Sequence, residues 1–282
     1  MGIFSGMEKY GLSKYENAKV IEKKDKTSGI TGVQKSEYEV ELTEEAILFD
    51  KKYKCPICDF EFVSKCVRTG KLKIIGKDSD LRPLYDKFDP LKYDAITCEK
   101  CGYSAISKYY GKVSTRQIKS IAEYIGKEFK GINNHLTKFT YEDAIARHKL
   151  ALVTSVVKDA KDSEKAYTCL KLAWVLRGKR LCLDKNDAEA KRLLQDEMEC
   201  ISNVYEGFTA AISSEVFPIA GMDEFTLKYI MADCARKLKK FEEAERLVGT
   251  ILVSRNASQR VKNEALNLKD AIRNDYKASR VE

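Results

Sequence analysis

The sequence predicts an α+β fold, in which a small β-rich module with four paired cysteines is followed by an all-α array of helices. Two Cys-x-x-Cys pairs lie within residues 47–110, among short stretches where apolar and polar side chains alternate. Beyond residue 110 the apolar side chains recur at the helical period of about 3.6 residues. Only 4 Pro and 15 Gly occur among 282 residues, which favours helix. We therefore assign residues 47–110 to the β module and 111–282 to the helical domain.

Two further segments are predicted ahead of the β module. Residues 13–46 are dense in charge and poor in large apolar side chains, which predicts a flexible linker. Residues 1–12 form a short N-terminal segment with apolar side chains at helical spacing, which are Ile3, Phe4, Met7 and Tyr10. It is either a docking peptide or a frayed terminus. It lacks the pattern of a signal peptide, and no apolar run approaches the ~20 residues that cross a bilayer, so we expect a cytoplasmic protein without a membrane segment.

Alternation with a period of two residues predicts the strands. Phe60 and Phe62 flank a glutamate, and Ala95 and Thr97 alternate on the approach to the second cysteine pair. Between them, Asp78-Ser79-Asp80 has the composition of a turn.

The two cysteine pairs predict a metal site. In Cys55-Pro-Ile-Cys58 and Cys98-Glu-Lys-Cys101, two intervening residues let both sulfurs turn inward on one tight loop, a zinc knuckle. Gly102 permits the positive φ that such a turn commonly needs. Nine cysteines, an odd number, in a chain without an export signal indicate thiols and metal ligands rather than disulfides. We expect one structural Zn²⁺ on these four sulfurs, with iron as the alternative metal.

We predict structural roles, and not metal binding or catalysis, for the other cysteines and the two histidines. Cys66 is a strand residue, although a fifth ligand or a redox thiol is the alternative. The remaining cysteines lie in helical patterns and are predicted to be small buried groups, namely Cys169, Cys182, Cys200 and Cys234. His148 shares a helical face with apolar residues and is a core histidine, whereas His135 lies in a loop.

Little in the sequence predicts catalysis. Asp78, Asp80 and Asp86 with Arg82 are either a carboxylate cluster or, as we prefer, residues that satisfy turns and pair at the surface. There is no phosphate-binding glycine loop and no nucleophile motif. A metal held by four protein sulfurs also leaves no position for substrate. We assign no catalytic residue and expect a protein that is not an enzyme.

Seven helices are predicted in the helical domain from apolar stripes and capping residues. Ser114 with Gln117, and Thr140 with Asp143, have the spacing of capping boxes. The other predicted starts are Ser163, Asp187, Asp223, Phe241 and Ser258. The fourth helix is expected to run toward Phe217, where Pro218 stops it. Short turns join the helices, so they should stack as antiparallel pairs.

Two resemblances refine this fold. Residues 232–252 resemble the core of a tetratricopeptide repeat, although the spacing between the helices of Trp174 and Cys234 exceeds the usual 34 residues, so the array is irregular. Nearly all of the chain after Leu48 resembles a bacterial family, found in clostridia and relatives, that is classed only as a domain of unknown function. The motifs that carry this likeness are the two knuckles, Val67–Leu72, Asp78–Pro83, Tyr93-Asp94, Leu172–Trp174 and Gly221–Glu224. The resemblance implies a zinc-ribbon-like module fused to tetratricopeptide-like helices and no established activity. His148 stands where that family is expected to have an aromatic residue, which argues against a ligand role.

Charge and fold together suggest three functions. The leading one is an adaptor that offers a concave helical groove to a peptide or protein partner. The second is nucleic-acid binding through basic helical residues, namely Lys179, Arg180, Lys237, Lys239 and Lys240. Residues 1–110 hold 20 Lys and Arg against 18 Asp and Glu, and four thiolates on Zn²⁺ add a charge of −2, so the metal-bearing part is close to neutral and a poor phosphate reader. The third is a redox switch in which oxidation of the thiols releases zinc.

Overall fold

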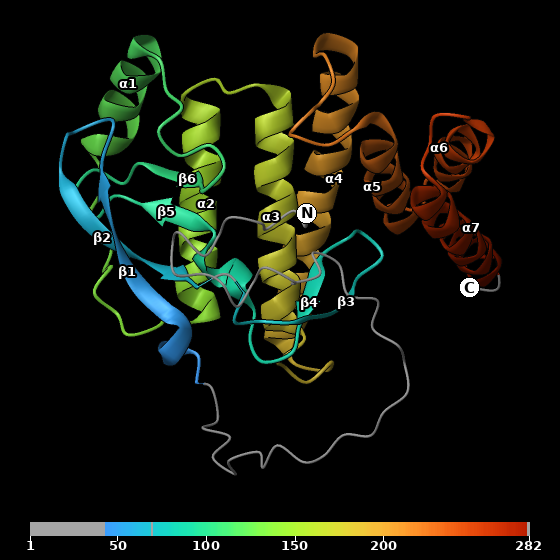
Figure 1. Ribbon diagram of the computed structural model, residues 1–282, viewed down its shortest axis with the longest axis horizontal. Helices are drawn as coiled ribbons and strands as arrows, with labels where there is room; N and C mark the ends of the chain where they lie inside the picture. The colour runs from blue at the N-terminus through green and yellow to red at the C-terminus, as the bar shows by residue number, and fades with distance from the viewer. Residues whose placement is uncertain (1–42, 69, 281–282) are drawn as a thin grey trace, which may run out of the picture. The chain divides into compact units, whose positions relative to one another are not determined.

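Three antiparallel hairpins form the β-rich part of the structure, a computed structural model that describes residues 43–68 and 70–280 (Figure 1). The paired strands are β1 (Leu48–Lys54) with β2 (Glu61–Val67), β3 (Ile74–Lys77) with β4 (Pro83–Tyr85), and β5 (Ala95–Thr97) with β6 (Ser104–Ile106). Each pair is a separate two-stranded sheet. The strands predicted at Phe62 and Thr97 are confirmed as β2 and β5.

The predicted segment 1–12 and residues 13–42 of the predicted linker lie outside the described residues. The last residues of the predicted linker belong to the fold. Glu44 accepts a hydrogen bond from Tyr93 Oη at 2.6 Å and pairs with Lys92 Nζ at 2.6 Å. A short 3₁₀ turn, Glu45–Ile47, then leads into β1 and buries Ile47 completely.

The described residues contain seven α-helices, as predicted. They are α1 (Thr115–Ile121), α2 (Tyr141–Val157), α3 (Asp162–Arg180), α4 (Ala188–Ser214), α5 (Glu224–Lys237), α6 (Phe241–Val253) and α7 (Gln259–Ala278). Both predicted capping boxes form, because Ser114 and Thr140 exchange side-chain and backbone hydrogen bonds with Gln117 and Asp143. Helix α1 continues into a π-helical turn, Ala122–Gly126.

Two helix boundaries differ from the prediction. Helix α3 begins at Asp162, so Ser163 lies inside its first turn and does not cap it. The Ser163 amide and hydroxyl instead donate to the Glu215 carboxylate at 3.0 and 2.7 Å. Helix α4 ends at Ser214, before the predicted Phe217, because Glu215 adopts an extended backbone. A carboxylate from the end of α4 therefore satisfies the start of α3, which places these two ends side by side.

The β-rich part and the helices share their interior. Helix α2 packs along β5 and β6, and α3 lies between α2 and α4 in the helical succession (Figure 1). The largest apolar cluster is built around α3, α4 and α5 and also includes Leu91 from the short 3₁₀ helix Pro90–Tyr93. A second cluster joins the cysteines of the knuckles to Ile121 and Ile125 of the α1 segment. The ranges 47–110 and 111–282 thus meet through buried side chains.

The helices pair in chain order but with unequal lengths. Helices α3 and α4 have 19 and 27 residues, whereas α5 and α6 have 14 and 13, so no constant repeat length runs along the array. Among the described helices, none has both the length and the apolar character needed to cross a membrane.

Candidate metal centre

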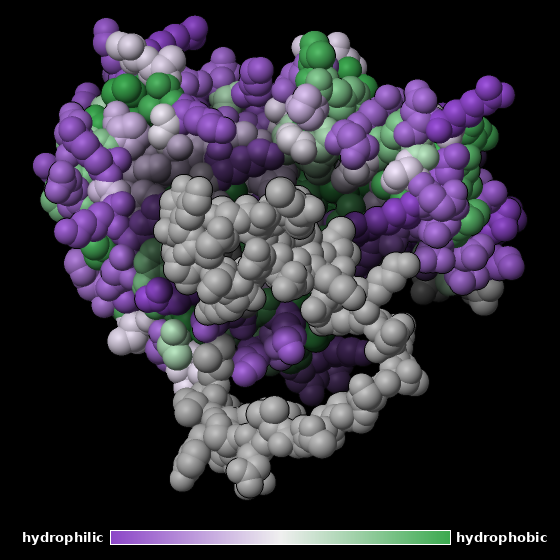
Figure 2. All heavy atoms as spheres, in the orientation of Figure 1, coloured by the Kyte–Doolittle hydropathy of each residue, from purple (hydrophilic) through white to green (hydrophobic). Residues whose placement is uncertain are grey.

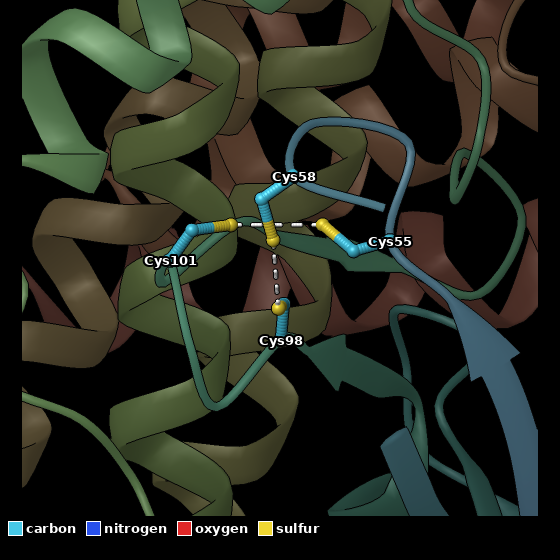
Figure 3. A group of neighbouring side chains, drawn as sticks. All are labelled: Cys55, Cys58, Cys98 and Cys101. Atoms are coloured by element: carbon cyan, nitrogen blue, oxygen red, sulfur yellow. Dashed lines mark hydrogen bonds between the residues drawn. The ribbon is translucent and has the colours of Figure 1, made fainter. Parts of the chain in front are cut away.

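The four sequence-predicted cysteines converge from two hairpin turns (Figure 3). Cys55 follows directly after β1, and Cys98 follows directly after β5, so each pair forms the turn of its own hairpin. Their four sulfur atoms all lie within 4.8 Å of one another. The 39 residues between Cys58 and Cys98 include the β3–β4 hairpin, which leaves the two turns free to face each other.

The distances between the sulfurs fit a tetrahedral metal. Cys55 Sγ lies 3.6 Å from Cys101 Sγ, and Cys58 Sγ lies 3.8 Å from Cys98 Sγ. A tetrahedron of sulfurs placed about 2.3 Å from a central zinc has edges of about 3.8 Å. A disulfide would need about 2.05 Å between sulfurs, and all four cysteines are free thiols. The thiols are therefore spaced for a common metal ion and not for pairwise oxidation.

The two turns repeat one backbone geometry. In the first, the Asp59 amide donates to the Cys55 carbonyl at 3.0 Å, and in the second the Gly102 amide donates to the Cys98 carbonyl at 3.0 Å. The residue after each second cysteine has a positive φ, 56° at Asp59 and 73° at Gly102. The sequence predicted this role for Gly102 but not for Asp59, since aspartate adopts such a conformation less readily than glycine.

Close packing supports the second knuckle. A Cβ added to Gly102 would lie 2.6 Å from the ring of Phe129, so glycine is required there for space as well as for φ. Tyr103, which follows, is fully buried and accepts a hydrogen bond from the Gly111 amide at 3.2 Å. The cysteines are buried except for Cys58, which is partly exposed. The apolar surroundings restrict water around the sulfurs.

Hydrogen bonds within the cluster favour a thiolate at one sulfur, whereas hydrogen bonds to neighbouring thiols and burial raise the pKa values of Cys55 and Cys101. The thiols of Cys101 and Cys55, with the backbone amides of Cys101 and Lys100, lower the pKa of Cys98 well below the usual thiol value. The Ile57 amide also donates to Cys55 Sγ at 3.5 Å. Because metal ligands must be deprotonated, this arrangement suits a cation such as Zn²⁺ or Fe²⁺.

Comparison with known proteins identifies the family of the chain. Residues 48–278 match the family model described as "Uncharacterized protein conserved in bacteria (DUF2225)". The chain belongs to this family. No curated protein and no solved structure matched the chain. The match covers both knuckles and all seven described helices, so the metal cluster and the helical array belong to one family unit.

The remaining thiols of this DUF2225 chain lie outside the four-sulfur cluster. Cys66 lies in β2, with its sulfur 3.2 Å from Tyr53 Oη. Cys169, Cys200 and Cys234 are buried in helices, as predicted, and burial raises their thiol pKa values. The prediction that Cys182 is buried is wrong. It is exposed because α3 ends at Arg180, which leaves Cys182 in the following turn.

Neither histidine belongs to the four-sulfur cluster. His148 is completely buried in α2, with Nδ1 2.7 Å from the Ala144 carbonyl oxygen, which is the position predicted for a core histidine. Burial lowers its pKa, so it is neutral at physiological pH. His135 is largely exposed, with Nε2 3.5 Å from a Glu99 carboxylate oxygen.

The acidic β3–β4 turn is buried against the helices. Arg177 of α3 donates to Asp78 at 2.9 Å and to both oxygens of Asp80, at 3.0 and 2.5 Å. Lys237 of α5 also donates to Asp80, at 2.8 Å. Asp80 and Arg177 are only 1% and 7% exposed, so the preferred interpretation of Asp80 as a surface residue is wrong. Desolvation would raise the Asp80 pKa, but Arg177 and Lys237 outweigh it and hold that pKa far below its usual value.

Further ion pairs extend this network. Glu197 of α4 accepts hydrogen bonds from Arg177 at 2.6 Å and from Arg180 at 3.0 Å. Asp233 of α5 is fully buried and pairs with Lys237 at 2.7 Å. The buried Arg82 donates to Asp89 at 2.7 Å, beside the hydroxyl of Tyr141. Asp86 is exposed and accepts a hydrogen bond from the Lys73 amide at 3.2 Å.

Sequence reasoning missed Arg177, Glu197, Asp233 and their partnership with the turn. All three lie 97 or more residues beyond Asp80 in the chain and belong to three different helices. The spacing of residues near Asp80 therefore could not indicate them. The available signal was the placement of charged residues on otherwise apolar helical faces.

Several cations proposed for nucleic-acid binding are neutralised. Lys179 pairs with Glu142 and Glu189 at 2.6 and 2.7 Å, and Arg180 and Lys237 belong to the buried network. Among the described residues, no ion pair involves Lys239 or Lys240, and Lys240 Nζ lies 4.7 Å from the ring centre of Tyr205. The predicted basic face is therefore largely compensated by carboxylates.

Proposed function

We propose that the four-thiol cluster binds one structural Zn²⁺ and that the chain is a non-enzymatic adaptor for a partner protein. The observation that carries the metal assignment is the set of four free thiols, spaced by 3.6 and 3.8 Å and held by two matching turns. When bound, the metal would cross-link the two hairpin turns. Four protein sulfurs complete a tetrahedral shell, so the ion stabilises the fold and does not receive substrate. Iron is the alternative, because thiolates also accept it.

Metal analysis of the purified full-length chain tests this assignment. We expect one zinc per chain, retained through gel filtration. Replacement by Cys55→Ser/Cys98→Ser should abolish it, whereas Cys66→Ser/Cys182→Ser, which leaves the cluster intact, should retain it. One iron per chain, with the visible absorbance of a ferric tetrathiolate, would show that the bound metal is iron and not zinc. An absence of metal in both freshly prepared and zinc-supplemented protein would refute the proposal.

The adaptor role needs a surface that the chain does not fill itself. The β3–β4 turn already occupies the space between α3 and α5 through Asp78 and Asp80. An open groove lies elsewhere, where the turn after α3 meets the start of α4. It has a volume of about 310 Å³ and is lined by Arg180, Leu181, Leu183, Lys185, Ala190, Lys191 and Leu194.

This α3–α4 groove favours an amphipathic acidic segment. Leu181 and Leu194 are large apolar side chains with 63% and 43% of their surface exposed. All the charged residues that line the groove are basic, and no carboxylate lines it in the described part of the chain. Lys185 and Lys191 can pair with acidic side chains of the partner, while its apolar side chains cover the leucines. We propose this groove as the docking surface, with a short segment of alternating leucine-like and acidic residues as its occupant.

Comparison of the partner's affinity for a groove variant and for a control variant tests the docking surface. Affinity capture uses nuclease-treated native extract, and a captured partner is then purified and its affinity measured by calorimetry. Leu181→Asp/Leu194→Asp should weaken binding at least tenfold, because it introduces like charge and removes apolar contact. Val216→Asp/Val253→Asp, at side chains 90% and 82% exposed, is the matched control and should bind normally. Equal binding by both variants, or a partner whose binding segment is basic, would contradict the proposal.

A further inference from the structure

Cationic side chains gather around the second knuckle. Residues 100–130 contain seven Lys and Arg against two Glu, a net charge of +5 within a chain of net charge +8. All seven are exposed, but Lys108 donates a hydrogen bond to the Ala220 carbonyl. The other six define the knuckle basic patch, which comprises Lys100, Lys112, Arg116, Lys119, Lys127 and Lys130. Most of the patch lies beyond residue 110, which is why counting charge up to that residue made the metal-bearing part look neutral.

The fold brings this sequence segment around the metal centre. Gly126 lies against Cys101, where an added Cβ would be 3.9 Å from the cysteine Cβ. An added Cβ on Gly131 would likewise be 3.9 Å from the Glu99 carbonyl, beside Lys100 at the tip of the knuckle. Ile121 and Ile125 reach into the apolar cluster of the cysteines. The patch therefore belongs largely to one segment that packs against the second knuckle, and Figure 2 shows both hydrophilic and hydrophobic side chains over α1.

The cations of the patch lack carboxylate partners. Neighbouring charges are paired, for example Lys138 with Glu45 and Lys92 with Glu44, but none of the six forms an ion pair with another described residue. Glu123 and Glu128 are exposed within the same segment and reduce its net positive charge, but neither forms an ion pair with a cation of the patch. These six charges are available to an external anion, unlike those of Lys179 and Lys237.

An exposed aromatic ring lies among them. Tyr124 is 66% exposed, a high value for a large aromatic side chain. It belongs to the π-helical turn Ala122–Gly126. Lys119 lies five residues before Tyr124 in the chain. Lys127 lies three residues after it, so two exposed cations lie close to the ring in sequence.

We propose that the knuckle basic patch binds single-stranded nucleic acid, with phosphates on its Lys and Arg side chains and a base stacked on Tyr124. Unpaired cations beside an exposed aromatic ring provide both contacts that such binding uses. An acidic protein segment would pair with the cations of the patch, but its binding would not depend on an exposed Tyr124 ring. Duplex readout would need an element that enters a groove, whereas α1 has only 7 residues.

Fluorescence anisotropy of the zinc-loaded full-length chain with a labelled oligo-uridylate tests this inference. The patch variant is Arg116→Gln/Lys119→Gln/Lys127→Gln, and the control is Arg255→Gln/Arg273→Gln/Lys277→Gln, which removes the same charge from exposed sites elsewhere. The patch variant should reduce the slope of log affinity against log salt by about 2, since each phosphate contact on a single strand contributes about 0.7. The control should leave that slope unchanged. Tyr124→Ala should weaken binding about tenfold with little change in slope.

The competing partners are outcomes of the same titration. Equal losses in the patch and control variants, or no effect of Tyr124→Ala, would overturn the inference. Tighter binding of polyglutamate or of anionic vesicles than of the oligonucleotide would also overturn it. The docking variant Leu181→Asp/Leu194→Asp should bind the oligonucleotide normally, so failure here and failure of the adaptor proposal can be told apart.

Discussion

Arg177 donates to both carboxylate oxygens of Asp80, at 3.0 and 2.5 Å, although 97 residues separate them. Both are almost fully buried. A paired, hydrogen-bonded charge of this kind tolerates burial, but a single partner left behind does not. The turn that lies between the two cysteine pairs in sequence is thus fixed to the helices by charge.

Removing one partner should be strongly destabilising. Arg177→Ala leaves Asp80 and Glu197 buried with fewer cations, so we expect the free energy of unfolding to fall by about 3–5 kcal/mol. Urea denaturation followed by circular dichroism measures this change. Arg273→Ala, at an exposed arginine, is the control and should change stability by less than about 0.5 kcal/mol. A loss below about 1 kcal/mol for Arg177→Ala would mean that the network contributes little.

The lowered pKa of the Asp80 carboxylate predicts an acid-dependent loss of stability. Its pKa is lowered in the folded state by Arg177 and Lys237, so its contribution is present above the unfolded pKa of about 3.9 and is lost as pH falls toward the lower folded value. The stability difference between wild type and Asp80→Asn should therefore be large at neutral pH and shrink below about pH 4. Acid release of metal affects both proteins and cancels in this difference. A difference that stays constant down to pH 3 would contradict the assignment.

Two glycines should respond oppositely to alanine. Gly102 has a φ of 73° and faces the Phe129 ring at 2.6 Å, so Gly102→Ala should destabilise the chain by more than about 1 kcal/mol and weaken metal retention. Gly249 lies within α6 with open space around its Cβ position, so Gly249→Ala should stabilise by about 0.5–1 kcal/mol. Thermal denaturation with metal present measures both. The same sign of change in the two variants would be inconsistent with this account.

The first knuckle offers a complementary substitution. Asp59 holds a φ of 56°, which glycine adopts without strain, and its ion pair with Lys54 is exposed and contributes little. Asp59→Gly should therefore raise the free energy of unfolding of the zinc-loaded chain by up to about 1 kcal/mol. Asp59→Val, with a β-branched side chain, should lower it. Chemical denaturation at constant free zinc distinguishes the two, and stabilisation by valine would show that backbone strain is absent.

Local patterns in the sequence were sufficient for the seven helices, for strands β2 and β5 and for the grouping of the four cysteines. Caps such as Ser114 and Thr140 act over three residues, and a Cys-x-x-Cys turn is equally local, so both can be read from spacing. The start of α3 was misread because Ser163 binds Glu215, which is 52 residues away. The pairing of Asp80 with Arg177 also depends on tertiary structure, and composition alone favoured a surface turn. The basic patch was missed because charge was compared between residues 1–110 and the rest of the chain, and the boundary separates Lys100 from the other five cations.

The position of the β3–β4 turn between the two knuckles has a consequence for turnover of the chain in the cell. A bound ion would close the loop from Cys58 to Cys98, and the middle of that loop is anchored to α3 and α5. Ion uptake and completion of the helical core are then thermodynamically linked, since a ligand that binds only the folded state stabilises the whole cooperative unit. Scarcity of zinc should accordingly shorten the lifetime of the entire protein through proteolysis, and its abundance should follow zinc supply.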